Sequence, residues 1–184
     1  MVDSQSEHTE GLNPIQIRLL RQDDIEIIRP ILECWIRHWE TGDIIPEEID
    51  EIIKEMENSI NNPNISTYLV AETPLDGVIG VVGFRPPTQE MLPFVTVDKA
   101  TELTNFYVAE KHRGGKGIGT SLLNAIEQRA VKRGYEQIVL NSGPRYKETA
   151  WGFYDKMGYA RVGEVKDMYG PGVHAPVWSK TLTK

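Results

Sequence analysis

A glycine-rich turn between a strand pattern and a helix pattern constrains the fold of this chain more than any other feature. Residues 101–108 are expected to form a strand, and residues 117–133 carry apolar residues at helical intervals before a Lys-Arg-Gly stop. Between them stands RGGKGIG, residues 113–119. Glycines allow successive backbone N–H groups to turn inward, and the amino end of a helix adds positive partial charge. The segment therefore predicts an anion-binding loop that suits a pyrophosphate.

The spacing within this loop excludes the two best-known phosphate motifs. A Walker loop requires Ser or Thr directly after Gly-Lys, but Gly117 follows Lys116. A dinucleotide fingerprint requires a third glycine three residues after the second, but Leu122 stands at that distance from Gly119. The alternative interpretation is that the glycines only form a flexible turn before the helix.

Composition places the chain among ordinary globular proteins. Its 184 residues carry a net charge of -7 and one cysteine, and no Cys and His spacing predicts a metal site. The acidic balance argues against nucleic acid or anionic membranes as partners. A single cysteine cannot form an internal disulfide, which favours the reducing cytoplasm. The sequence shows neither a signal-peptide pattern nor an apolar run long enough for a membrane span. We expect residues 1–13 to form a flexible tail and residues 14–184 a single domain.

The remaining apolar patterns predict alternating strands and helices. Pro30 is expected to kink the first helix or divide it, and the proline-rich loop over residues 85–94 is free to shape a substrate pocket. The other expected elements are strands at 15–19, 65–72, 77–84, 137–141, 159–168 and 175–182, and helices from about 23 to 39, from 46 to 60 and from about 150 to 157.

Two motifs in order resemble the GNAT superfamily of acetyl-CoA-dependent N-acetyltransferases. The loop RGGKGIG is similar to the family's pattern of Gln or Arg, two residues, Gly, one residue and Gly or Ala, and AWGFYDKMGY, residues 150–159, resembles its later helix and turn. The resemblance implies a mixed α/β fold with a mostly antiparallel sheet of about six to seven strands. It also implies a splay between the fourth and fifth strands, and about four flanking helices.

The sequence departs from the family pattern at two positions. Gly114 occupies the Gln or Arg slot, so that Arg113 stands one residue early. Lys147 stands where the family commonly has Asn, and Asn141 at the end of the preceding strand is the candidate to replace it.

The resemblance assigns a set of residues to the coenzyme. Main-chain groups of Phe106, Tyr107 and Val108 would pair with the pantetheine arm. The diphosphate would be bound by residues 113–120, which are Arg113, Gly114, Gly115, Lys116, Gly117, Ile118, Gly119 and Thr120.

For catalysis the resemblance indicates two residues. Tyr154 matches the family tyrosine that donates to the coenzyme sulfur, although a core stripe at helical spacing explains Tyr154 equally simply. Glu102 matches a position where some members carry a base, and the alternative is a solvated carboxylate. Glu72, Asp98 and His38 are weaker candidates.

These expectations describe an enzyme that transfers the acetyl group of acetyl-CoA to a primary amine of a small molecule, without a metal, and that forms a homodimer as family members commonly do. Three alternatives stay open. The first is that the acceptor is a protein or peptide amine, and the second is that the chain is a non-catalytic module that binds acetyl-CoA. The third is a different acyl donor such as succinyl-CoA, for which Arg85 and Arg145 are candidate contacts.

Overall fold

The computed structural model describes residues 15–115 and 117–183, and the predicted tail over residues 1–13 lies outside them. The strands are β1 (Gln16–Leu19), β2 (Thr67–Thr73), β3 (Gly77–Arg85), β4 (Ala100–Val108), β5 (Gln137–Asn141), β6 (Ala160–Val165) and β7 (Ala175–Thr181). They form one sheet in the order β1-β2-β3-β4-β5-β7-β6. Every neighbouring pair is antiparallel except β4 and β5. This confirms the predicted fold class.

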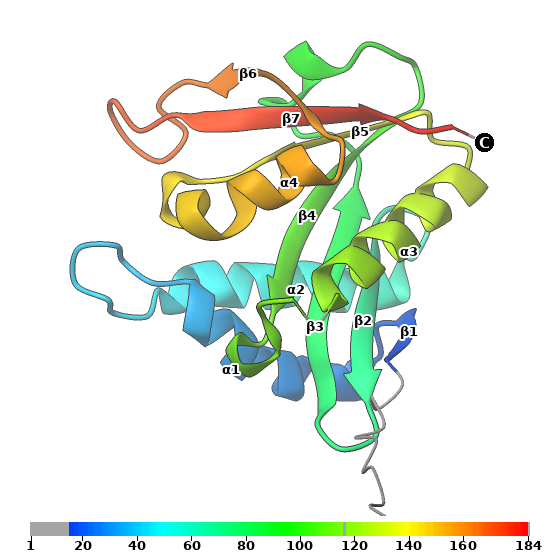
Figure 1. The fold of residues 1–184 in the computed structure, drawn as a ribbon, viewed down its shortest axis with the longest axis vertical. Helices are drawn as coiled ribbons and strands as arrows, with labels where there is room; N and C mark the ends of the chain where they lie inside the picture. The colour runs from blue at the N-terminus through cyan, green and yellow to red at the C-terminus, as the bar shows by residue number, and fades with distance from the viewer. Residues whose placement is uncertain (1–14, 116, 184) are drawn as a thin grey trace, which may run out of the picture.

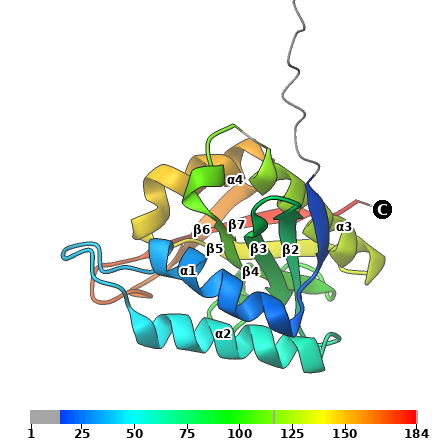
Figure 2. The same ribbon diagram turned by 90° about the horizontal axis from the view of Figure 1, so that it is seen from below.

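Helices cover both faces of the sheet (Figure 2). The helices α1 (Ile25–Trp35) and α2 (Pro46–Asn61) pack on one face, where they share a buried cluster with Tyr68, Val70 and Val81. The helices α3 (Ile118–Lys132) and α4 (Gly152–Lys156) pack on the other face. Within the described residues, no helix combines the length and apolarity that a membrane span requires.

Short helical turns connect these elements. Four of them are 3₁₀ turns, at Gln22–Asp24, Leu92–Phe94, Glu110–His112 and Pro144–Tyr146. A π-helical turn, Lys147–Trp151, leads into α4.

The sheet divides between β4 and β5, as the resemblance implied. Their parallel pairing covers only Ala100↔Gln137, Thr101↔Ile138 and Glu102↔Val139, after which the two strands separate. In Figure 1, β2, β3 and β4 run down the view, whereas β5 and β7 run across it. The last six residues of β4 therefore present one backbone edge that no strand pairs.

A bulge in β4 accompanies this separation. Gly83 pairs with Thr104 and Val81 pairs with Tyr107, so two β4 residues oppose one residue of β3. One of the two is Asn105, whose φ of 49° is unusual for a residue with a side chain. Its amide donates to the hydroxyl of Tyr68 at 2.7 Å, which stabilises the distorted backbone from β2, on the far side of β3.

Two local expectations differ from the structure. The first helix ends at Trp35 rather than near residue 39, and it passes Pro30 without being divided. The proline-rich loop contributes only Arg85 directly to the cavity described below, because Met91 turns inward to pack on Val139 and Val177. The prediction that this loop shapes a pocket is therefore wrong for most of its length.

The close approach of Gly83 in β3 to Tyr68 in β2 leads to a prediction about stability. A Cβ at Gly83 would stand 2.5 Å from the ring of Tyr68, which is buried and held through its hydroxyl by Asn105. We expect Gly83→Ala to lower the free energy of unfolding by about 1–3 kcal/mol, because overpacking a buried site forces side chains off their preferred rotamers.

Gly152→Ala is the matched control. This residue has helical dihedrals and no atom near its Cβ position, so the substitution should stabilise the fold by about 0.5–1 kcal/mol. Urea unfolding of both variants measures the difference, and equal stability of the two would contradict the packing argument.

Candidate functional site

A cavity of about 920 Å³ opens where β4 and β5 part. Its lining comes from both faces of the sheet, with Glu55 of α2 on one side and Tyr154 of α4 on the other. Residues 103–108 line it continuously along the unpaired part of β4. The volume falls in the range of small-molecule sites, about 300–1,000 Å³.

The glycine loop forms one end of this cavity. Gly114, Gly115 and Gly117 have φ angles of 76°, 89° and 73°, a region that residues with a Cβ rarely adopt. Gly117 is also the residue that precedes α3, and no side chain caps the helix. Lys116, which was predicted to contact phosphate, lies outside the described residues.

The first amides of α3 have no acceptor among the described residues. Within the described chain, the backbone N–H groups of Gly117, Ile118, Gly119 and Thr120 donate no hydrogen bond. Uncapped N–H groups at the start of a 15-residue helix attract an anion, because the helix dipole adds to their partial charges. Diphosphate binding by these amides stays a prediction.

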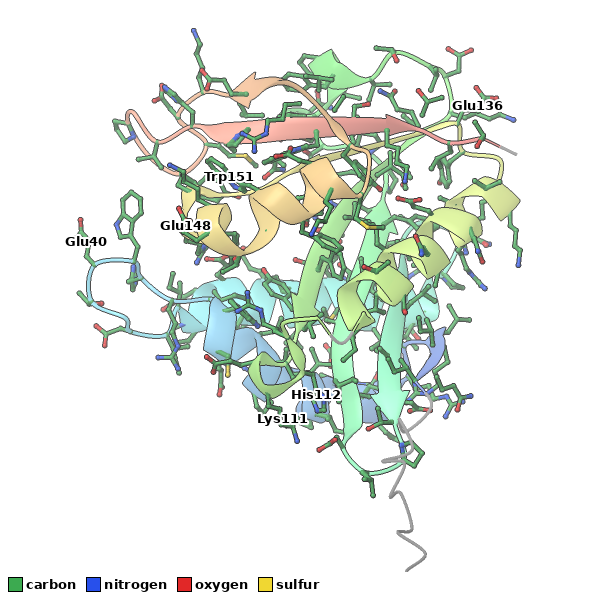
Figure 3. The ribbon with its side chains drawn as sticks, in the orientation of Figure 1. Glu40, Lys111, His112, Glu136, Glu148 and Trp151 are labelled. Carbon is green, nitrogen blue, oxygen red and sulfur yellow. The ribbon has the colours of Figure 1, made fainter. Side chains whose placement is uncertain are left out.

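The segment before the loop is attached to α1. Trp35 donates its indole N–H to the Val108 carbonyl at 2.9 Å, and the Arg113 guanidinium lies 4.1 Å from the centre of the Trp35 ring. Lys111 and His112, close to α1 just beyond the end of β4 (Figure 3), both contact Asp76 in the β2–β3 turn. These contacts fix the strand end from which the glycine loop departs.

The predicted pantetheine residues lie along the divided part of the sheet. Phe106 and Val108 pack against the α3 and α4 side, whereas Tyr107 packs against the α1 and α2 side. The Tyr107 hydroxyl lies 3.4 Å from the hydroxyl of Tyr146, which follows β5. This pair of phenols bridges the two strands that have separated.

Tyr154 lies where a proton donor would face the cavity. It is 6% exposed, its ring contacts Phe106 and Trp178, and its hydroxyl forms no hydrogen bond within the described chain. Burial, followed by the influence of Tyr146, raises the pKa of Tyr154 well above its ordinary value. The phenol is therefore protonated at neutral pH and available to donate.

Glu102 also lines the cavity, but both of its oxygens have partners. The side chain is 2% exposed. Arg85 donates to one oxygen at 3.1 Å and the backbone N–H of Thr88 donates to the other at 2.8 Å. Both oxygens of this carboxylate are therefore already hydrogen-bond acceptors within the protein.

Asn141 lies at the far wall and also has internal partners. Its amide oxygen accepts from the Tyr169 hydroxyl at 3.2 Å, and its nitrogen lies 3.6 Å from the Met91 sulfur. It lines the cavity, so the structure brings it to the predicted region.

The comparison with known families agrees with this geometry. The model described as the Acetyltransferase (GNAT) family matches residues 29–159. The chain belongs to this family. It is also 30% identical over 99 residues to human N-acetyltransferase 8B, a match that covers 54% of this chain. The chain spans 40% of the length of that curated relative.

Solved structures of GNAT proteins share the fold. An N-acetyltransferase from Staphylococcus aureus Mu50 has a TM-score of 0.71 at 21% identity, with coverage of 92% of this chain and 99% of that one. The protein yncA from Salmonella typhimurium, solved with its cofactor acetyl-CoA, has a TM-score of 0.67 at 17% identity, with coverage of 93% and 95%.

Several other candidates lie away from the cavity of this GNAT chain. Glu72 pairs with Arg18 at the edge of the sheet, and Asp98 and His38 are exposed and outside the lining. In residues 15–115 and 117–183, no group of three or more His, Cys, Asp and Glu side chains could hold a metal ion.

The site also contains residues that the sequence reasoning missed. These are Glu48, Glu51 and Glu55, which follow one another on one face of α2 and line the cavity. Arg145, which the sequence named only as a candidate acyl contact, pairs with Glu48 at 2.6 Å from the loop after β5. The spacing of three, four and seven residues along the helix was the available signal, because such positions share a face.

The left-handed conformation of the glycine loop leads to a prediction about acetyl-CoA binding. Gly117→Ala forces a Cβ into the left-handed region at a cost of about 1–2 kcal/mol, and relief of this strain would move the amides at the start of α3. We expect acetyl-CoA affinity, measured by calorimetry, to fall about tenfold, the equivalent of about 1.4 kcal/mol.

Gly134→Ala is the control, because Gly134 has a φ of 83° and no atom near its Cβ position at the opposite end of α3. This variant should lose similar stability and keep the affinity. Equal affinity in the two variants would contradict a role of the loop in binding.

Proposed function

We propose that this protein transfers the acetyl group of acetyl-CoA to a primary amine of a small molecule. The observation that carries the proposal is the row of unpaired amides at the start of α3, which opens on a cavity between separated strands. A diphosphate held by these amides would direct the rest of the coenzyme along β4. Membership of the acetyltransferase family supports the same activity.

The residues of the cavity suggest how the reaction proceeds. Acetyl-CoA supplies a thioester that a neutral amine can attack directly. The unpaired edge of β4 at Phe106, Tyr107 and Val108 would bind the pantetheine amides as an added strand would. Tyr154 would protonate the departing sulfur, and its packing among aromatic rings holds the hydroxyl in place.

The charges around the acceptor end favour a cation. Arg113 and Lys156 line the cavity at the glycine loop and on α4. At the acceptor end, formed by α2, the end of β3, the start of β4 and the loop after β5, the charged residues are Glu48, Glu51, Glu55 and Glu102, with Arg85 and Arg145. The balance is 4 negative and 2 positive charges, or net -2. An ammonium group would be attracted, because the low-dielectric walls of a cleft concentrate the field.

The ion pairs that Arg85 and Arg145 form with these glutamates favour an acetyl group over an acyl group that carries a negative charge. Arg85 pairs with Glu55 and Glu102, and Arg145 pairs with Glu48. A succinyl carboxylate would have to compete with these glutamates for each guanidinium. We therefore propose acetyl-CoA as the donor.

Tyr154→Phe tests the transfer step. Because the hydroxyl has no internal partner, its removal should leave folding and acetyl-CoA affinity unchanged. We expect kcat for release of the free CoA thiol to fall about 100-fold, the lower end of the general-acid contribution of about 10²–10⁴. Unchanged turnover would refute the role of Tyr154, and a wild-type protein that binds acetyl-CoA but acetylates no amine would support the non-catalytic module.

Three amines of equal chain length test the charge argument. We expect kcat/KM to fall from 1,4-diaminobutane to butylamine to 4-aminobutanoate, by about threefold to tenfold at each step at low salt, and the differences to shrink as salt screens the charges. If 4-aminobutanoate reacts fastest, the arginines select a carboxylate and the proposed preference is wrong. A short peptide with a free amino terminus, assayed in parallel, tests the alternative protein acceptor.

A further inference from the structure

Glu55 differs from the other acidic groups of the cavity in having one buried oxygen without a hydrogen-bond partner in the described chain. Its Oε2 accepts from Arg85 at 2.9 Å and lies 3.3 Å from the amide nitrogen of Asn105. Its Oε1 is buried and has no hydrogen-bond partner in the described chain, while the Tyr68 hydroxyl also interacts with this carboxylate. A buried acceptor left unpaired costs about 1–3 kcal/mol, so this oxygen fits a ligand group that donates a hydrogen bond.

The position of Glu55 brings this oxygen close to the reacting centre. Glu55 contacts Asn105, the bulged residue immediately before the predicted pantetheine contacts Phe106 and Tyr107. It approaches from α2, on the face opposite Tyr154. A donor on one face and a free acceptor on the other would enclose a group placed between the strands.

The neighbouring carboxylate is less suited to the same task. Glu102 is bound through both oxygens, to Arg85 and to the Thr88 backbone. Arg85 bridges the two glutamates, so the pair shares one positive charge. In this arrangement Glu102 fixes Arg85, and Arg85 orients Glu55.

We propose that Glu55 is the catalytic residue that binds the acceptor ammonium and removes its proton. This inference rests on the proposed acetyl transfer and names a different base from Glu102, the residue indicated by the family resemblance. The experiment below therefore compares the two glutamates directly.

The proton and electron balance of the step is complete. One proton of the ammonium moves to Glu55 Oε1, and the freed nitrogen lone pair forms the C–N bond to the acetyl carbonyl carbon. The C–S bond breaks and its electron pair goes to sulfur, which takes the proton of Tyr154. The proton that the new amide nitrogen loses restores Tyr154, and the proton on Glu55 leaves to solvent.

Several charged and titratable groups face Glu55 and share its environment. Arg85 comes from β3, Glu102 from β4, and Tyr68 from β2. Glu48 and Glu51 line the cavity from earlier turns of the same helix. Arg85 is the positively charged neighbour of Glu55 and forms an ion pair with it at 2.9 Å.

Glu55→Gln and Glu102→Gln test the assignment, with Glu47→Gln as a control on the exposed surface of α2 outside the cavity. The wild type first identifies the fastest of the three probe amines. With that amine, we expect Glu55→Gln to lower kcat about 100-fold at pH 7 and to regain activity about tenfold per pH unit, as the free amine becomes neutral without a base. Glu102→Gln and Glu47→Gln should keep the wild-type shape of the pH profile.

The outcomes separate this inference from the proposed function. If the wild type acetylates no probe amine, the proposed function fails for this substrate class. If the wild type is active and Glu55→Gln stays within threefold of it, or if only Glu102→Gln regains activity at high pH, then Glu55 is not the base. Thermal unfolding and acetyl-CoA affinity check that Glu55→Gln is folded, and Glu55→Asp provides a second variant, which should retain more activity than Gln if a carboxylate is required.

Discussion

The separation of β4 from β5 is the constraint on which the rest of the site depends. Three residues of each strand pair, and beyond Glu102 and Val139 the backbone of β4 is left with one unpaired edge. An unpaired edge inside a protein is costly unless a ligand or solvent satisfies it, which is why the cavity follows this edge from Leu103 to Val108. The bulge at Asn105 belongs to the same distortion, because it inserts an extra residue into β4 within the part of the strand that no longer pairs with β5.

The start of α3 likewise has backbone N–H groups without hydrogen-bond acceptors in the described chain. A helix normally begins with a side chain that accepts from its first amides, but here the preceding residue is Gly117, which offers no acceptor. The three left-handed glycines and the missing cap reduce the stability of the free loop. A bound anion would supply the missing acceptors and stabilise the loop. The loop and the strand edge together therefore fit one extended ligand, which has a charged end and an arm that carries amides.

The sequence predicted the parts of the fold that local patterns control. The helix after the glycine loop, the strand over residues 137–141 and the β2–β3 hairpin were located to within about two residues, because hydrophobic spacing and glycine stops specify them directly. The role of Tyr154 came from resemblance to a family, whereas anion binding by the loop was predicted from its glycines and from the helix that follows them. The direction taken by the proline-rich loop was not predictable, because Met91 packs on strands that lie about fifty and ninety residues further along the chain.

The acceptor wall was missed for the same physical reason. It is built by contacts between distant segments, with Arg145 reaching Glu48 across 97 residues and Arg85 reaching Glu55 across 30. On the sequence, these glutamates belong to an ordinary amphipathic helix whose polar face would be solvated. Only the folded chain shows that part of this face is covered by β4 and by the loop after β5. The chemical role of a charged helix face therefore depends on the residues that pack over it. Here Asn105 and Arg85 contact one oxygen of Glu55, and the proposed ligand would bind the other.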